Sequence, residues 1–214
     1  GDAAGISTGA NKADYCSNSG DVSSTNNTAG GILGSPNSVD ATIYGCYNTG
    51  NITAGRYAGG IIGSCYNNID IKGCYHAEGA ISGGSPSGGI IGEIKTSGSN
   101  WSNTDTQNIT SCYSTQTSAS NYGGIIGEIE EPTAAHNGLT PILANTVSDY
   151  YYSGADKGVY IHYDGVSDYA TKFIDGTHLW FGTGTPVITL LNSHLDSGFE
   201  AIFDINTLSK INGD

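Results

Sequence analysis

A five-residue string recurs four times along this chain at nearly constant spacing, and it restricts the fold more than any other feature. GGILG occupies residues 30–34, and GGIIG follows at 59–63, 88–92 and 123–127, so the first two steps are equal and the third is slightly longer. Units of about 29 residues cannot enclose a core alone, whereas stacked copies bring identical positions together and share one continuous core. The repeat therefore predicts a solenoid.

A second landmark, a cysteine, precedes each pentapeptide by a similar interval, and in the last three copies tyrosine follows it. These positions are Cys16, Cys46, Cys74 and Cys112, with Tyr47, Tyr75 and Tyr113. The landmarks divide the chain into units at about 11–34, 41–63, 69–92 and 107–127, with a degenerate fifth unit from Val147. We expect residues 1–152 to form one repeat domain.

The unit consists of short β-branched and aromatic runs bounded by Asn, Gly, Ser and Thr, and no repeat shows the periodicity of an amphipathic helix. The expected fold is therefore all-β, a parallel β-helix-like solenoid in which each Ile lies about 4.8 Å from its equivalent in the next unit. Glycine suits the bends of each coil. The first glycines of the pentapeptides are expected there: Gly30, Gly59, Gly88 and Gly123.

If successive side chains of a strand point to opposite faces, the sequence leaves open which face two sets of residues occupy. Ile43 and Tyr47 are separated by an even step and would share a face, so Cys46 either points outward or follows a bulge. The adjacent isoleucines of GGIIG raise the same problem, since alternation exposes one of them unless the strand is covered on both sides.

The character of the sequence changes toward its C-terminus, because all four Phe and Trp180 lie after residue 170. A solenoid needs terminal units that cover its last open edge. We expect residues 153–214 to form this cap, with strands at 158–163 and 200–205. One short helix is expected at 186–195, with Thr185 as N-cap and Pro186 in the first turn.

Composition and charge exclude several classes of function. The 214 residues include 33 Gly, and 7 Lys and Arg against 20 Asp and Glu give a net charge of −13. Nucleic acid and anionic membrane surfaces are therefore unsuitable partners. No apolar run approaches the roughly 20 residues that span a bilayer, so no membrane insertion of this segment is expected. The chain has no Met and opens at Gly1, which suggests a processed or trimmed piece of a longer protein.

No metal or cofactor site is predicted. Five Cys is an odd number, so at least one thiol is unpaired in a monomer, and the repeated cysteines serve either as small apolar spacers or as one bridge. No Cys-x-x-Cys spacing indicates zinc, and no His-Glu-x-x-His motif is present. Acidic residues at 128–131, Asp164 and Asp168 suit either Ca²⁺ or, more commonly, solvated surface charge.

Three surface readings remain open. The tyrosines at 47, 75 and 113 form either an aromatic strip for stacking sugars or part of the core. Recurrent Thr and Asn are also typical of an ice-binding surface. Such a surface requires Thr at equivalent positions of successive units, and Ser82 and Gly83 interrupt that pattern. Some polysaccharide lyases and hydrolases have a β-solenoid fold. In this chain, however, the lone Arg56 and the scattered Lys provide few cations to bind an acidic sugar.

The segments 46–53 (CYNTGNIT) and 57–63 (YAGGIIG) resemble the GLUG-motif repeat. The resemblance covers about residues 11–127, and residues 173–195 resemble the segment that often closes such arrays. That family is known from bacterial surface and adhesin-like proteins, haemagglutinin-like proteins and the non-catalytic part of IgA-specific metallopeptidases. The resemblance implies a secreted or surface-displayed bacterial protein and carries no catalytic residues to transfer.

The expected function is therefore a non-enzymatic, adhesin-like or structural module at the cell surface. It would present Trp101, in the extra loop before the fourth unit, and the C-terminal cap to a host or matrix glycan or protein. The alternative is a carbohydrate-active enzyme, a polysaccharide lyase or hydrolase, on a β-helix. Turnover of a polysaccharide would favour that alternative, and an apolar groove without clustered titratable groups would exclude it.

Overall fold

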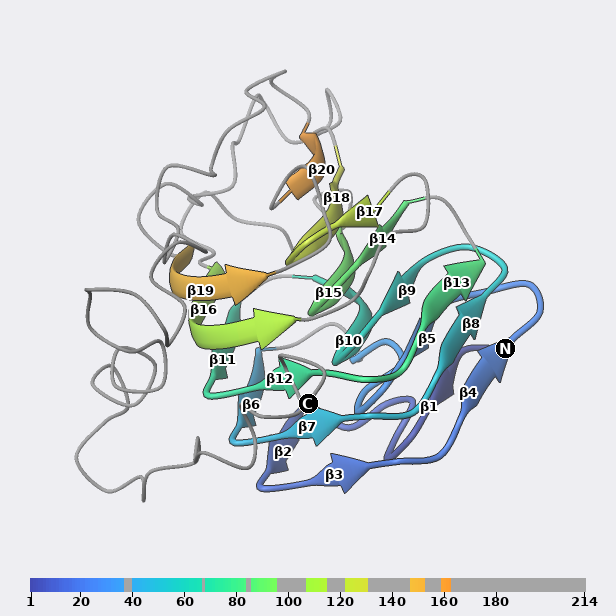
Figure 1. Ribbon diagram of the computed structural model, residues 1–214, viewed down its shortest axis with the longest axis horizontal. Helices are drawn as coiled ribbons and strands as arrows, with labels where there is room; N and C mark the ends of the chain where they lie inside the picture. The colour runs from blue at the N-terminus through green and yellow to red at the C-terminus, as the bar shows by residue number, and fades with distance from the viewer. Residues whose placement is uncertain are drawn as a thin grey trace.

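The computed structural model describes residues 1–36, 40–66, 68–83, 86–95, 107–114 and 122–130, and the backbone of 147–152 and 159–162. Every regular element in these ranges is a short β-strand, and every strand pair is parallel. The strands stack in parallel sheets that the chain visits in turn (Figure 1). The predicted all-β class is confirmed, and this arrangement is consistent with a β-solenoid.

The described strands form four sheets. The first contains β1 (Ala3–Ala4), β5 (Ala29–Gly30), β9 (Ala58–Gly59), β14 (Ser87–Gly88) and β17 (Tyr122–Gly123). The second contains β10 (Ile62–Cys65), β15 (Ile91–Ile94), β18 (Ile126–Ile129) and β20 (Val159–His162). The third contains β2 (Lys12–Asp14), β6 (Ala41–Tyr44), β11 (Ile69–Lys72), β16 (Gln107–Ser114), β12 (Tyr75–His76), β7 (Tyr47–Asn48) and β3 (Ser17–Asn18), and β19 (Val147–Tyr152) pairs with β16. The fourth contains β13 (Ile81–Gly83), β8 (Ile52–Ala54) and β4 (Val22–Ser24).

The register places equivalent positions of successive units side by side. The first glycines of all four pentapeptides pair in sequence, Gly30 with Gly59, Gly59 with Gly88 and Gly88 with Gly123. In β19, Val147 pairs with Ile109, and β20 extends the second sheet by pairing with β18. Repetition in sequence thus becomes repetition along the stack.

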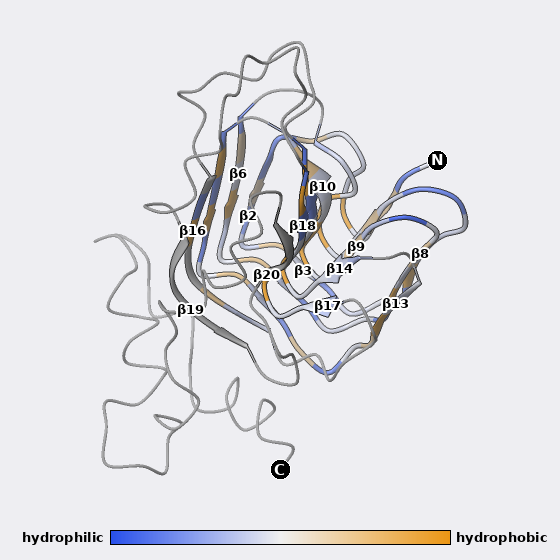
Figure 2. Cartoon of the chain, turned by 90° about the horizontal axis from the view of Figure 1, so that it is seen from above, coloured by the Kyte–Doolittle hydropathy of each residue, from blue (hydrophilic) through white to orange (hydrophobic). Residues whose placement is uncertain are grey.

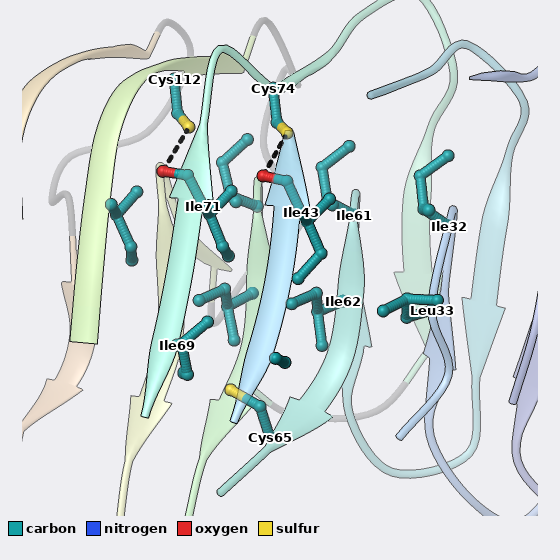
Figure 3. Packing of buried hydrophobic residues seen from close by; sticks show 14 of the residues in the cluster. Ile32, Leu33, Ile43, Ile61, Ile62, Cys65, Ile69, Ile71, Cys74 and Cys112 are labelled. Atoms are coloured by element: carbon teal, nitrogen blue, oxygen red, sulfur yellow. Dashed lines mark hydrogen bonds between the residues drawn. The ribbon is translucent and has the colours of Figure 1, made fainter. Parts of the chain in front are cut away.

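The larger core lies between the second and third sheets. Its isoleucines come from β6, β11 and β16 on one side and from the pentapeptides and the strands after them on the other. Figure 3 shows these side chains meeting between the strands, and Figure 2 shows hydrophobic residues alternating with hydrophilic ones along them. A smaller cluster, centred on Val22, Ile52 and Ile81, fills the space between the fourth and first sheets. Burial of these columns is the main stabilising contribution.

The repeated cysteines point into the larger core. Cys46, Cys74 and Cys112 are fully buried there, and Cys16 packs against its edge. The residue before the cysteine has a left-handed backbone in the first three units, with φ of 52° at Tyr15, 60° at Gly45 and 61° at Gly73. This residue bends the chain between β6 and β7, so that the cysteine turns to the same side as Ile43. Of the two alternatives left by the alternation pattern, the outward cysteine is excluded for the described units.

Both isoleucines of each GGIIG are buried because they occupy a bend and not a continuous strand. Ile61 and Ile62 have no exposed surface, and β10 begins only at Ile62. Their two backbone N–H groups donate to the same carbonyl, that of Ile90, at 2.9 Å each. One carbonyl therefore serves two donors, and the two side chains enter the core side by side.

The first glycine of the pentapeptide is required by space. A Cβ on Gly30, Gly59 or Gly88 would lie only 1.9, 1.8 or 1.9 Å from the carbonyl oxygen of Leu33, Ile62 or Ile91, respectively. The chain folds back on itself at this point so closely that no side chain fits. This explains why glycine recurs at the position that the sequence assigns to a bend.

A polar column runs through the stack beside the second glycine of each pentapeptide. The Asn18 amide donates to Asn48 Oδ1 at 2.7 Å, and the Asn48 amide donates to His76 Nδ1 at 2.9 Å. Asn48 Oδ1 also accepts from the Gly50 N–H, which fixes the orientation of this amide. His76 is therefore bonded as the neutral tautomer with its proton on Nε2, which donates to the Gly79 carbonyl at 2.9 Å. The fully buried Asn48 and His76 are thus satisfied within the column.

The left-handed position gives a direct prediction. We expect Gly45→Ala to lower the free energy of unfolding by about 1 kcal/mol, because a Cβ is disfavoured in this backbone conformation. Tyr15→Gly at the equivalent, exposed position is expected to raise it by about 0.5 kcal/mol, since relief of strain exceeds the added chain entropy. Urea unfolding measures the change in the free energy of unfolding for each variant. Changes of the same sign would contradict a left-handed backbone at these two positions.

Several predicted features lie outside the described residues. These are Trp101, the helix at 186–195, the strand at 200–205, and Asp164 and Asp168.

Candidate functional site

A polar groove of about 220 Å³ lies on the side of the stack. Its lining consists of Asp2, Asn27, Thr28, Ser35, Arg56, Ser64, Tyr66 and Lys95. These residues come from the segments that precede β1, β5 and β9, from the residue after the first pentapeptide, and from the ends of β10 and β15. The groove therefore spans three successive units and the β1 segment that precedes them.

The repeat builds this groove from columns of equivalent positions. Ser64 pairs with Glu93, which pairs with Glu128 in the next strand. The N–H of Lys95 donates to the carbonyl of Cys65, which places Lys95 beside Tyr66 in the adjacent unit. The groove consequently runs in the direction in which the units stack.

Lys95 is the centre of the contacts along one wall. Its Nζ lies 3.4 Å from Glu93 Oε2 and donates to the Tyr66 hydroxyl at 3.1 Å. The same ammonium lies 4.9 Å from the centroid of the Tyr66 ring, within range of a cation–π interaction. Its position is thus fixed by partners in two units.

The groove lining also includes the one arginine of the chain. The Arg56 guanidinium stacks over the Tyr57 ring at 5.2 Å, and its backbone N–H donates to the Asn27 carbonyl. Beside it, the Thr28 hydroxyl donates to Asp2 Oδ1 at 3.0 Å. Hydrogen-bond donors and acceptors therefore line this part of the groove as well.

Behind the groove lies a group of coupled titratable side chains: Glu93, Glu128 and Tyr57. Glu93 is almost fully buried, and burial raises its pKa to about 7, although the Lys95 ammonium and a hydrogen bond from Tyr57 oppose the shift. Burial likewise raises the pKa of Glu128 above its ordinary value, against a hydrogen bond from Tyr57. Burial and then the Glu93 charge raise the pKa of the Tyr57 hydroxyl. The Tyr57 hydroxyl thus stays protonated at neutral pH.

The local environment acts on Lys95 and Glu93 in different ways. Burial alone would lower the pKa of Lys95, but the Glu93 carboxyl and the Tyr66 hydroxyl together raise it above its ordinary value. Lys95 therefore remains charged while Glu93 changes protonation near neutral pH. Chemically, this arrangement supplies a fixed cation, aromatic surface, hydroxyl groups and a carboxyl that exchanges its proton at a pH of about 7.

The tyrosines that follow the repeated cysteines form a continuous stack away from this groove. The Tyr47 and Tyr75 rings lie 4.9 Å apart with an interplanar angle of 2°, and Tyr75 and Tyr113 lie 4.8 Å apart at 5°. Tyr47 and Tyr75 are half-buried and Tyr113 is buried. The rings cover one another's faces, so this strip offers ring edges to a ligand between Tyr47 and Tyr113.

Sequence reasoning placed the ligand contact at Trp101, which lies outside the described residues, and did not find the groove. Its members were noted only singly, as a lone arginine and as scattered lysines. Spacing carries the missing signal, since Tyr66 and Lys95, and also Ser64 and Glu93, are separated by the length of one unit. Which columns face each other across a bend cannot be read from spacing alone.

Within the described ranges, no group of three His, Cys, Asp or Glu side chains is arranged to hold a metal ion. In the same part of the chain, no helix has the length and apolar character needed to cross a membrane. Comparisons with protein-family models, curated proteins and solved structures gave no match to this chain.

Proposed function

We propose that the chain is a β-solenoid of Gly-rich repeat units, closed by a C-terminal cap, that acts as a non-enzymatic binding module. Its ligand would be an extracellular glycan or a host or matrix protein, bound at the surface of a bacterial cell or after secretion. The resemblance of residues 11–127 to GLUG-motif repeats supports the location.

The polar groove carries this proposal. Aromatic side chains and fixed hydrogen-bonding groups in a concave site are the usual means of recognising a sugar or a polar peptide. Arg56, Tyr66 and Lys95 supply these groups: Lys95 and Tyr66 hold each other in place before a ligand arrives, and Arg56 lies over the Tyr57 ring. The direction of the groove along the stack suits an extended polymer.

A binding array with matched variants tests this function. The full chain is applied to a glycan and extracellular-matrix array together with Arg56→Ala and Tyr66→Ala. Lys12→Ala and Tyr15→Ala are the controls, because they remove an exposed cation and an exposed aromatic outside the groove. Groove variants are expected to weaken binding at least about tenfold and the controls to leave it unchanged. Trp101→Ala is applied to the same array. Binding lost only in this variant would place the site at Trp101 instead, and no binding by the wild type would contradict the proposal.

One observation favours the alternative, a carbohydrate-active enzyme. Glu93 and Glu128 are register neighbours, both with raised pKa values, and a carboxyl with a pKa of about 7 suits a general acid at neutral pH. An apolar groove without clustered titratable groups would have excluded an enzyme. The titratable groups Glu93 and Glu128 are clustered, so this criterion does not exclude one.

Turnover of a polysaccharide panel separates the two functions. An enzyme predicts that Glu93→Gln abolishes hydrolysis or elimination, while Glu78→Gln at an exposed position retains it. The pH profile of the wild type would show a limb at a pH of about 7 that Glu93 provides. Absence of turnover with retained array binding would favour the binding module.

A further inference from the structure

Cys16 and Cys46 stand opposite each other in the first two units. Their neighbours set the register, since Asp14 pairs with Tyr44 and Ser17 pairs with Tyr47. Adjacent strands in a sheet are about 4.8 Å apart, which falls within the Cα separation that a disulfide tolerates. The backbone therefore brings the two cysteines to bonding range.

The Cys46 thiol is directed toward the first unit. Its sulfur accepts a hydrogen bond from the backbone N–H of Cys16 at 3.3 Å, and it lies 3.3 Å from the carbonyl of Ala13 in the first unit and 3.3 Å from that of Tyr44 in its own unit. The Cys16 thiol makes the equivalent contact in its own unit, with the carbonyl of Asp14 at 3.4 Å. The Cys46 sulfur thus already lies against the backbone of Cys16.

Exposure distinguishes Cys16 from the other cysteines. It is half-buried, whereas Cys46, Cys65, Cys74 and Cys112 have no exposed surface. A reagent in solution therefore reaches Cys16 first.

We propose that Cys16 and Cys46 form a redox-active pair, which a low-molecular-weight disulfide converts to an intramolecular disulfide that fastens the first unit to the second. In the first step, the Cys16 thiolate attacks the reagent, which forms a mixed disulfide and releases one reagent thiol. In the second step, the Cys46 thiolate attacks the Cys16 sulfur and releases the second reagent thiol. Both cysteines are oxidised, one reagent disulfide is reduced to two thiols, and both cysteine protons pass to solvent or to the released thiolates.

Electrostatics favours Cys46 as the second nucleophile. Hydrogen bonds with the Cys74 thiol and then with Cys16 lower the pKa of Cys46, despite its burial. Burial raises the pKa of Cys74 and of Cys65 well above the ordinary value, so their thiolates are disfavoured. Burial also raises the pKa of Cys16, which disfavours the thiolate that the first step requires.

Tryptic cleavage of the chain gives a direct test. Cleavage after Lys12, Arg56, Lys72, Lys95 and Lys157 leaves Cys16 and Cys46 together in peptide 13–56. Peptides 57–72, 73–95 and 96–157 each carry one of the other cysteines. The folded chain is treated with oxidised glutathione and then denatured in the presence of an alkylating reagent. It is digested with trypsin, and the peptide masses are measured by mass spectrometry.

The expected result is a peptide 13–56 that has lost two hydrogens and carries no alkyl group, while the three other peptides each carry one. In Cys16→Ser the same peptide is expected to carry one alkyl group on Cys46, and Cys65→Ser is expected to behave as the wild type. Alkylation of both cysteines in the wild type, a glutathione adduct that persists on Cys16, or a cross-link from peptide 13–56 to another peptide would overturn the proposal. Oxidation of the urea-unfolded chain is the control, in which the selectivity for peptide 13–56 is expected to disappear.

Discussion

Gly59→Ala is expected to lower the free energy of unfolding by at least about 3 kcal/mol, or to remove the cooperative transition altogether. The added methyl would lie 1.8 Å from the Ile62 carbonyl oxygen and 2.6 Å from the Gly92 nitrogen. Both are backbone atoms, so no rotation of a side chain relieves the overlap, and the bend itself must open. Because Gly59 pairs with Gly30 and Gly88, the distortion also reaches the neighbouring units.

Gly20→Ala is the matched control for this substitution. A Cβ at Gly20 would meet only Asn18 Oδ1, at an ordinary contact distance of 3.5 Å. We expect the free energy of unfolding of this variant to lie within about 1 kcal/mol of that of the wild type. Urea unfolding followed by circular dichroism measures both variants, and equal stabilities for the two would show that the close approach at Gly59 is not a constraint.

The pH dependence of stability is expected to report the burial of Glu93. Below about pH 4.5, Glu93 is protonated in both the folded and the unfolded chain, and above about pH 7 it is ionised in both. Between these values only the folded chain retains the proton, so the free energy of unfolding decreases as the pH rises. A pKa raised from 4.5 to about 7 corresponds to a loss of about 3 kcal/mol over this interval.

Glu93→Gln isolates this contribution, because glutamine is close in shape to the protonated carboxyl and does not ionise. We expect the variant and the wild type to differ little near pH 4.5, and the variant to be the more stable by up to about 3 kcal/mol at about pH 8. Urea unfolding at several pH values measures the difference directly. A difference that does not change with pH, or that grows toward acid pH, would contradict the protonation of buried Glu93.

The stacking of strands follows from the sequence because a repeat is a translation. Once equal units pair in parallel, Ile43, Ile71 and Ile109 must form one column, and so must the first glycines of the pentapeptides. Neither conclusion requires knowledge of how the chain bends within a unit. Sequence reasoning therefore predicted the all-β class and the parallel pairing.

The contents of the core within one unit depended on bends that the sequence pattern does not reveal. Alternation assumes a straight strand, but the left-handed residue before Cys16, Cys46 and Cys74 and the fold-back at GGIIG both break it. Cys46 thereby joins Ile43 inside, and Ile61 and Ile62 are buried together. A period of two cannot describe a segment that turns a corner.

The candidate site depended on tertiary structure for a related reason. Spacing of one unit aligns Tyr66 with Lys95, but the meeting of that column with Arg56 depends on how the chain turns around the bend between them. The burial that brings the pKa of Glu93 to about 7 arises from the same packing. The sequence by itself determined which positions stack, because stacking requires only a period; the tertiary structure decided which columns face each other, because that requires the angles of the bends.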